Sequence, residues 1–142
     1  MRRVVSLVVL VALAALAALA AACQGSSTGE LTGKTWTLSA VTQDVPAFQG
    51  VIPPADQGKY TIEFGTDNTF SAKADCNTVQ GSYYAGSGGS LTISPGPTTL
   101  MACPEGSLGS AYTAALATTT GYTIANGQLT LKLSGGGTLQ FS

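Results

Sequence analysis

The chain has 142 residues, the length of a single domain, with no histidine and a formal net charge of −1. Residues 23–142 carry four lysines, seven acids and no arginine, and therefore a net charge of −3. This composition argues against a nucleic-acid partner, because binding phosphate requires basic side chains, and equally against a basic membrane-binding surface.

The N-terminal segment has the pattern of a secretory signal. Arg2 and Arg3 give a positive start, the segment from Val4 to Ala22 is almost wholly apolar, and three alanines lead into Cys23. A basic segment, an apolar segment and a small-residue cleavage site in this order are typical of signal peptides. We therefore expect residues 1–22 to be a signal peptide and the protein to be exported.

Cys23 is the candidate lipidation site, because LAAAC at residues 19–23 resembles a bacterial lipobox. Cleavage before Cys23 would leave its thiol to carry diacylglycerol. Two alternatives stay open, since ordinary signal peptidase could cleave after the alanines, and the apolar segment could remain as an uncleaved anchor. We expect a lipid anchor on Cys23, in the outer face of the cytoplasmic membrane or in the outer membrane, with the rest of residues 23–30 as a flexible tether.

The domain is expected over residues 31–142 and begins with a strand over residues 34–40, where apolar and hydroxyl side chains alternate. Residues 44–58 contain three prolines and two glycines, which predicts a long loop. Long loops in compact domains are often functional. We hypothesise that Phe48, Val51 and Ile52 contact an envelope protein or a small apolar ligand; the alternative is that they pack over the end of a barrel.

Alternating apolar and polar residues predict further strands along most of the chain. These strands cover residues 60–64, 70–74, 79–85, 91–93, 122–124, 129–133 and 139–141. The sequence GTDN predicts a hairpin turn between the first two of these strands. The last three are separated by NG and GGG turns and are expected to form an antiparallel meander.

Cys76 and Cys103 remain as a pair once Cys23 is set aside, with 26 residues between them. A disulfide is expected in an exported protein, and closing a loop of this size stabilises a fold by about 3–4 kcal/mol in the chain-entropy model. A redox pair is usually spaced C-x-x-C, and zinc requires three or four ligands that this chain lacks. Two buried free thiols are the remaining alternative.

One segment has helical periodicity and predicts a helix over about residues 104–119. Pro104 and Glu105 suit its first turn, and Gly121 suits its end. Its apolar stripe is expected to cover one face of the sheet and consists of Leu108, Tyr112, Ala115, Leu116 and Thr119.

Five stretches together resemble the META domain, the family of the heat-inducible HslJ-type bacterial lipoproteins. They are TGKTWTLSAV, YTIEFGTDNTFSAKADCNTVQGSYY, LTISPGPTTLMACP, AYTAAL and GYTIANGQLTL. The resemblance extends from Leu31 to Ser142, with two departures: Asp75 stands where glycine is common, and the last turn lacks acidic residues. It implies an exported, often lipid-anchored β-domain, linked to heat shock, antibiotic tolerance and virulence, without established catalytic residues.

The residues that carry this resemblance have structural interpretations. They are Trp36, Asn77, Gly81, Tyr83, Thr99, Met101 and Pro104. Trp36 and Met101 are expected in the core, with a ligand platform as the alternative for Trp36. Asn77 is expected to bond nearby backbone groups, with ligand binding as its alternative, and Gly81 predicts a bulge or a close approach of another backbone.

The expected fold is mainly β (α+β): a compact, curved antiparallel sheet or small barrel with one helix and one disulfide. No catalytic residue, cofactor or metal is expected, because histidine is absent and no acid lies in an apolar setting. The sequence favours a monomeric structural, stress-response or protein-binding role at the cell envelope. The alternatives are a module for a small apolar ligand and an inhibitor of exported proteases, which would use a rigid loop such as Ser94–Pro97.

Overall fold

Residues 28–44 and 47–142 are described by a computed structural model, with the backbone alone for residues 44 and 47–49. The expected signal peptide, Cys23 and residues 24–27 of the expected tether lie outside these ranges, as does the side chain of Phe48. Among the helices of these ranges, none has the length and apolar character needed to cross a membrane.

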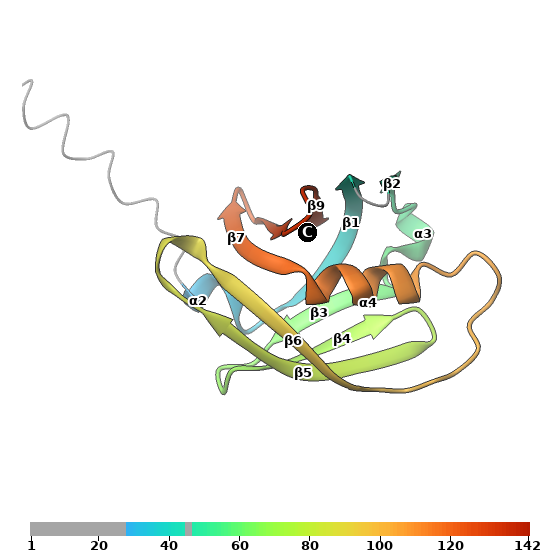
Figure 1. Ribbon diagram of the computed structural model, residues 1–142, viewed down its shortest axis with the longest axis horizontal. Helices are drawn as coiled ribbons and strands as arrows, with labels where there is room; N and C mark the ends of the chain where they lie inside the picture. The colour runs from blue at the N-terminus through green and yellow to red at the C-terminus, as the bar shows by residue number, and fades with distance from the viewer. Residues whose placement is uncertain (1–27, 45–46) are drawn as a thin grey trace, which may run out of the picture.

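The described chain forms an antiparallel sheet of nine strands (Figure 1). In chain order the strands are β1 (Thr35–Asp44), β2 (Ala47–Val51), β3 (Tyr60–Phe64), β4 (Thr69–Ala74), β5 (Asn77–Ala85), β6 (Leu91–Thr98), β7 (Thr119–Ala125), β8 (Gln128–Leu133) and β9 (Thr138–Phe141). Their spatial order is β6-β5-β4-β3-β1-β9-β8-β7, and β2 pairs with the second half of β1. The predicted mainly β fold, its β3–β4 hairpin and its C-terminal meander are confirmed.

The sheet curls into a half-barrel, and its two edge strands approach each other at one point. Ser90, just before β6, forms an isolated antiparallel bridge with Gly121 in β7. Apart from this bridge, β6 and β7 lie near each other without forming a hydrogen-bonded ladder, so the barrel is not closed there and the concave face of the sheet needs a separate cover.

Three α-helices occur in the described ranges, and only the last is longer than one turn. They are α2 (Thr28–Leu31), α3 (Pro54–Gln57) and α4 (Gly109–Ala117), with a 3-10 turn η2 at Ser87–Gly89. Helix α4 lies across the concave face and packs against β6 and β4 (Figure 1). It buries Tyr112, Ala115 and Leu116, as the predicted apolar stripe requires.

Tyr112 of α4 sits at the centre of the core. Its ring meets the ring of Tyr60 edge to face at a centroid distance of 5.9 Å and lies 6.4 Å from the ring of Phe141. Its hydroxyl donates a hydrogen bond to the carbonyl of Thr61 at 3.1 Å, and burial raises the pKa of that hydroxyl. The helix is therefore joined to β3 by a polar contact as well as by apolar packing.

Trp36 is almost wholly buried, which confirms its prediction as a core residue. Its indole Nε1 donates to the carbonyl of Leu31 at 2.9 Å, and Leu31 is itself buried. Helix α2 is thus attached to the core. Helix α2 includes residues 28–30, which were expected to be part of the tether.

Gly81 produces the predicted bulge and close approach. The pairing of β5 with β6 shifts register between Val79 and Gly81. A β-carbon on Gly81 would collide with the carbonyl oxygen of Ser94 and lie 2.7 Å from the ring of Phe70. Only glycine fits this position without moving a neighbouring strand.

One element prediction is confirmed with shorter bounds, and one is wrong. The predicted helix 104–119 is only the nine residues of α4: Pro104 and Glu105 lie in the preceding loop, and Thr119 and Gly121 belong to β7. Its start is delayed because the Leu108 amide donates to the Tyr60 hydroxyl at 3.0 Å instead of entering a helix.

The predicted loop 44–58 instead contains β2 and α3. Strand β2 forms because the chain folds back along β1, with Val51 opposite Ala40 and the Ile52 amide donating to the Ser39 carbonyl at 2.8 Å. Pro54 then occupies the first turn of α3, where its missing N–H is not needed.

The close approach at Gly81 has a testable consequence. We expect Gly81→Ala to lower the free energy of unfolding by about 1–3 kcal/mol, because the added methyl group must displace β6 or Phe70. Gly58→Ala is the matched control, since a β-carbon there meets nothing within 4 Å and its φ of −64° suits any residue. Equal unfolding midpoints for the two variants in urea titrations would contradict this assignment.

Candidate functional site

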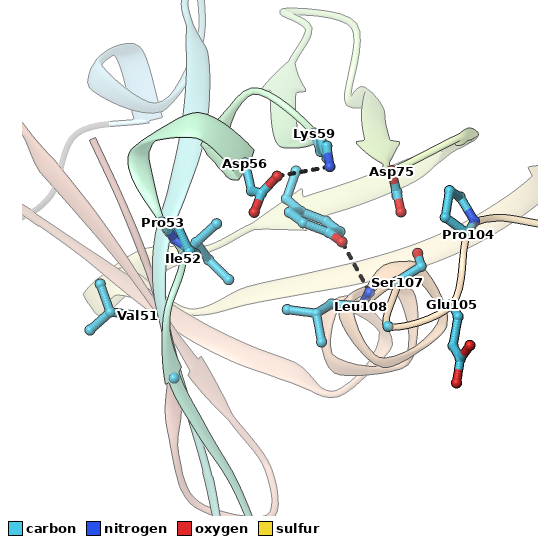
Figure 2. A pocket seen from close by; sticks show the side chains of 13 residues that line it. Val51, Ile52, Pro53, Asp56, Lys59, Asp75, Pro104, Glu105, Ser107 and Leu108 are labelled. Carbon is cyan, nitrogen blue, oxygen red and sulfur yellow. Dashed lines mark hydrogen bonds and ion pairs between the residues drawn. The ribbon is translucent and has the colours of Figure 1, made fainter.

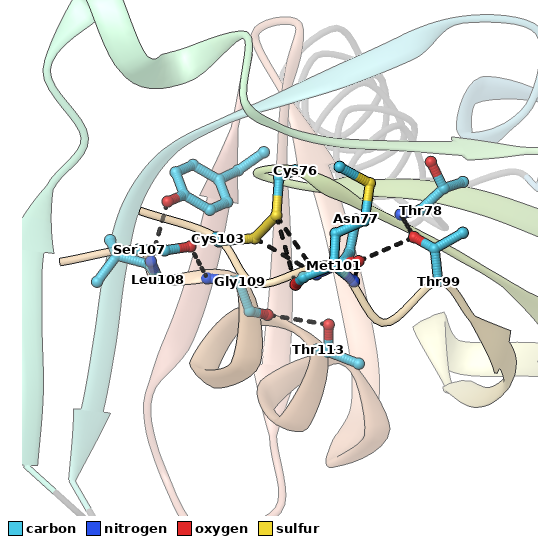
Figure 3. Close-up of a disulfide and its surroundings, with 11 residues drawn as sticks. Cys76, Asn77, Thr78, Thr99, Met101, Cys103, Ser107, Leu108, Gly109 and Thr113 are labelled. Carbon is cyan, nitrogen blue, oxygen red and sulfur yellow. Dashed lines mark hydrogen bonds between the residues drawn. A yellow bond between two sulfur atoms is a disulfide. The ribbon is translucent and has the colours of Figure 1, made fainter. Parts of the chain in front are cut away.

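The predicted disulfide between Cys76 and Cys103 is present, with 5.5 Å between the two Cα atoms (Figure 3). It joins the turn between β4 and β5 to the segment that connects β6 with α4. We call residues 99–103 of that segment the disulfide loop. The disulfide loop has no secondary structure, so its position depends on the disulfide and on side-chain hydrogen bonds.

Asn77 holds the disulfide loop through both ends of its carboxamide (Figure 3). Its Oδ1 accepts hydrogen bonds from the Met101 amide at 2.7 Å and from the Thr99 hydroxyl at 2.9 Å. Its Nδ2 donates to the Met101 carbonyl at 3.0 Å and lies 3.3 Å from the sulfur of Cys103. Asn77 thus bonds backbone groups as predicted, but those groups lie 24 residues further along the chain.

Thr99 extends this network to strand β5. The Thr78 amide donates to the Thr99 hydroxyl at 2.9 Å, and the Thr99 amide donates to the Thr78 carbonyl at 3.1 Å. The first residue of the disulfide loop is therefore fixed to the sheet immediately beside Asn77.

The centre of the disulfide loop faces solvent. The side chain of Leu100 is 94% exposed and that of Met101 is 62% exposed, and Ala102 is exposed as well. The prediction that Met101 fills the core is wrong, because Asn77 fixes its backbone at the surface. The loop combines a constrained backbone with three exposed apolar side chains.

A cleft of about 410 Å³ lies beside the disulfide loop (Figure 2). Val51, Ile52 and Pro53 form one side, and Asp75 and Pro104 lie across from them. The Tyr60 hydroxyl and Leu108 meet at its floor through their hydrogen bond. The cleft is therefore formed where the β2–α3 connection approaches the loop that leads into α4.

The charges around the cleft are mainly negative. Lys59 forms an ion pair with Asp56 at 2.8 Å, and this hydrogen bond and charge raise the pKa of Lys59. Asp75 and Glu105 add two carboxylates to the lining. Nowhere in residues 28–44 and 47–142 do three or more potential metal ligands gather.

The predicted partner residues separate in the structure. Both Val51 and Ile52 line the cleft, but Val51 is 78% exposed, whereas Ile52 is 2% exposed and belongs to the core. The Ser94–Pro97 segment is not a free loop, because it lies in β6, where Ser94 and Pro95 pair with β5.

The family model for the META domain matches residues 29–142. The chain belongs to the META domain family. The HslJ-type membership within that family stays a prediction.

Solved structures show the same fold. A protein from Burkholderia xenovorans determined by NMR is 32% identical, over 81% of this chain and 84% of that chain, with a TM-score of 0.62. A DUF4847 family protein from Bacteroides vulgatus is 16% identical, over 79% of this chain and 93% of that chain, with a TM-score of 0.56. No curated protein matches the sequence.

The other motif residues of the META domain support the fold and the cleft. Tyr83 is buried, packs edge to face against Phe64 at 4.9 Å, and donates from its hydroxyl to the Gly65 carbonyl at 2.6 Å. Pro104 lines the cleft. Sequence reasoning missed the cleft itself, because its walls come from three separate segments and have no local motif.

The backbone at Asp75 explains why aspartate can stand where glycine is common in the family. Its φ is 62°, in the left-handed region that glycine enters without a steric penalty and that aspartate tolerates better than most residues. Its amide donates to the Lys59 carbonyl at 2.7 Å, which fixes the turn before Cys76. Asp75 therefore retains the turn that glycine would allow, and adds a carboxylate to the cleft.

The Asn77 network predicts a local loss of stability on substitution. We expect Asn77→Ala to lower the free energy of unfolding by about 1–3 kcal/mol, because the Met101 amide loses its acceptor, and to speed hydrogen exchange of that amide. Thr78→Ala is the neighbouring control, since the Thr78 side chain is exposed and only its backbone joins the network. Equal effects of the two substitutions on both measurements would refute this role of Asn77.

Proposed function

We propose that this META-domain protein is an exported lipoprotein, anchored to the cell envelope through Cys23, that acts by binding another protein rather than by catalysis. The META domain supplies the fold for this proposal. The lipid anchor, the envelope location and the binding role are its additions, and the stress-response setting follows from the family resemblance.

The observation that carries the proposal is the distance along the molecule between its two ends. Helix α2 lies at one end, and the segment that leads from β6 into α4 extends, with α3, to the other end (Figure 1); residues of that segment and of α3 line the cleft. Only residues 24–27 separate Cys23 from α2. The five residue steps from Cys23 to Thr28 span at most about 18 Å, so a lipid on Cys23 would keep the α2 end close to the bilayer. The opposite end would face away from the membrane, toward a partner.

Two charged surface groups, Asp67 and Lys59, are held in their ordinary charged states. Hydrogen bonds from Thr69 lower the pKa of Asp67, and Asp56 raises the pKa of Lys59, so both groups are stabilised in their ordinary charged forms. A general acid or base at neutral pH requires the opposite shift. Burial raises the pKa of Tyr112 strongly, but Tyr112 is buried in the core and does not line the cleft.

The cleft has the features of a protein-binding surface. Val51 presents an exposed apolar side chain at its rim, and Pro53 and Pro104 form rigid walls. Carboxylates beside an apolar wall suit a partner segment that carries both apolar and basic side chains. A small apolar ligand is less well matched, because Asp56, Lys59, Asp75 and Glu105 also line the cleft.

The lipid anchor is tested by metabolic labelling with radioactive palmitate. We expect the wild-type protein to be labelled and Cys23→Ala to be unlabelled, because the thiol is the point of attachment. Wild-type and variant proteins are compared at equal amounts in membrane fractions. Label on the Cys23→Ala protein, or no label on the wild type, refutes the anchor.

The binding surface is tested by photo-crosslinking in living cells of the source organism. A photoreactive side chain at Val51 should give a discrete crosslinked band, whereas the same side chain at Tyr84, which is 72% exposed on β5, should not. Both positions are exposed, so the substitutions should leave the melting temperature nearly unchanged. Identical crosslinking patterns from the two positions argue against a specific partner at the cleft.

A further inference from the structure

The Leu100–Met101 peptide bond has an arrangement that the anchor and the cleft do not explain. Its acyl side carries the most exposed large apolar side chain recorded for the described residues, that of Leu100. Its amine side is the Met101 nitrogen, which donates to Asn77 Oδ1 at 2.7 Å. Within the described ranges, the N–H and C=O of Leu100 itself make no hydrogen bond.

We propose that the disulfide loop is a substrate-like inhibitory loop for serine endopeptidases whose primary specificity pocket is apolar, with Leu100 as the residue that enters the pocket. The proposal goes beyond the binding role at the cleft and does not depend on Cys23. It also moves the inhibitor hypothesis away from Ser94–Pro97, which is part of the sheet.

The disulfide loop has the shape and the chemistry that the substrate-binding site of such a protease requires. Endopeptidases bind a substrate segment through its backbone and through pockets for its side chains, so the segment must offer free backbone groups and an accessible side chain. Leu100 offers both, and Thr98 to Pro104 contains no charged residue that an apolar pocket would reject. Because the loop is already constrained, little conformational entropy is lost on binding.

The same constraints explain why the loop would inhibit and not simply be cleaved. The protease serine hydroxyl would attack the Leu100 carbonyl carbon, the bond to the Met101 nitrogen would break, and that nitrogen would take the proton and leave as an amine. In this fold the amine stays in place, because Asn77 binds the Met101 nitrogen and carbonyl and the Cys76–Cys103 disulfide holds the chain beyond them.

The acyl side is held by the same carboxamide. The Thr99 hydroxyl donates to Asn77 Oδ1, and the Thr99 backbone pairs with Thr78. The new amine therefore remains beside the Leu100 ester at a high effective concentration. Its attack on the ester re-forms the peptide bond and releases the serine hydroxyl, so the reaction reverses before water completes the hydrolysis.

The test measures inhibition of chymotrypsin-type and subtilisin-type proteases, with the full chain in a mild detergent and a small chromogenic peptide substrate. We expect the wild type to inhibit at least one of them, and Leu100→Asp to weaken inhibition by at least about 30-fold, because it removes the side chain that fills the pocket. Tyr84→Asp is the matched control, an exposed apolar-to-acidic change on β5 that should leave inhibition unchanged.

A second variant tests the backbone constraint by Asn77 separately from the contact of Leu100 with the protease pocket. Asn77→Ala should turn the inhibitor into a substrate, cut after Leu100, with the cut detected by mass spectrometry of the reduced protein. If Asn77→Ala does not fold, Thr99→Val removes only the hydrogen bonds of the Thr99 hydroxyl and should likewise raise the rate of cleavage after Leu100.

The proposal is overturned if wild type at about 100 μM inhibits neither protease type. It is also overturned if Leu100→Asp inhibits as well as wild type, or if the wild type is cut at another bond. These results leave palmitate labelling and crosslinking at Val51 unaffected, so the two proposals fail independently.

Discussion

The order of the strands sets the main constraint on this fold. Strands β6 and β7 follow each other in sequence and lie at the two ends of the strand order, but they form no ladder with each other, so residues 99–118 connect them across the opening of the half-barrel. A half-barrel has an open concave face lined with apolar side chains, and the crossing segment is the part of the chain available to cover it. Helix α4 does so with Tyr112, Ala115 and Leu116, which join the buried core of the sheet.

The crossing segment cannot be regular throughout, because it must first leave the edge of the sheet. The disulfide and the Asn77 carboxamide fix this irregular part, which would otherwise be a free loop of ten residues between β6 and α4. Holding a loop by its backbone frees its side chains from packing. Leu100 and Met101 consequently face solvent although leucines fill the core elsewhere, so the contacts that fix this part of the fold also create an exposed, constrained apolar surface.

The two candidate surfaces of the protein share one end of the half-barrel. The cleft forms where β2 and α3 fold back over β3, and the disulfide loop emerges beside it, with Asp75 and Pro104 at the boundary. The α2 end is fixed to the core by the Trp36–Leu31 hydrogen bond. The two ends of the domain therefore have different roles. One end continues to the N-terminal segment, and the other carries the surfaces that we propose for binding and for inhibition.

The sequence by itself determined the features that depend on local pattern or on residue chemistry. Period-two alternation located every described strand except β2, cysteine parity identified the Cys76–Cys103 pair, and the glycine within a strand indicated the bulge at Gly81. These succeeded because strand periodicity and disulfide chemistry are properties of a few residues.

Only the tertiary structure decided the features that depend on contacts between distant segments. Residues 44–58 look like a loop until β1 is available as a pairing partner, and Val51 and Ile52 are adjacent yet face solvent and core, respectively. The start of α4 is set by the Tyr60 hydroxyl, 48 residues away from Leu108. Met101 has an apolar side chain of the kind that usually lies in a core, but Asn77 holds it at the surface. The hydrogen bonds to its backbone determine its place more strongly than the hydrophobicity of its side chain.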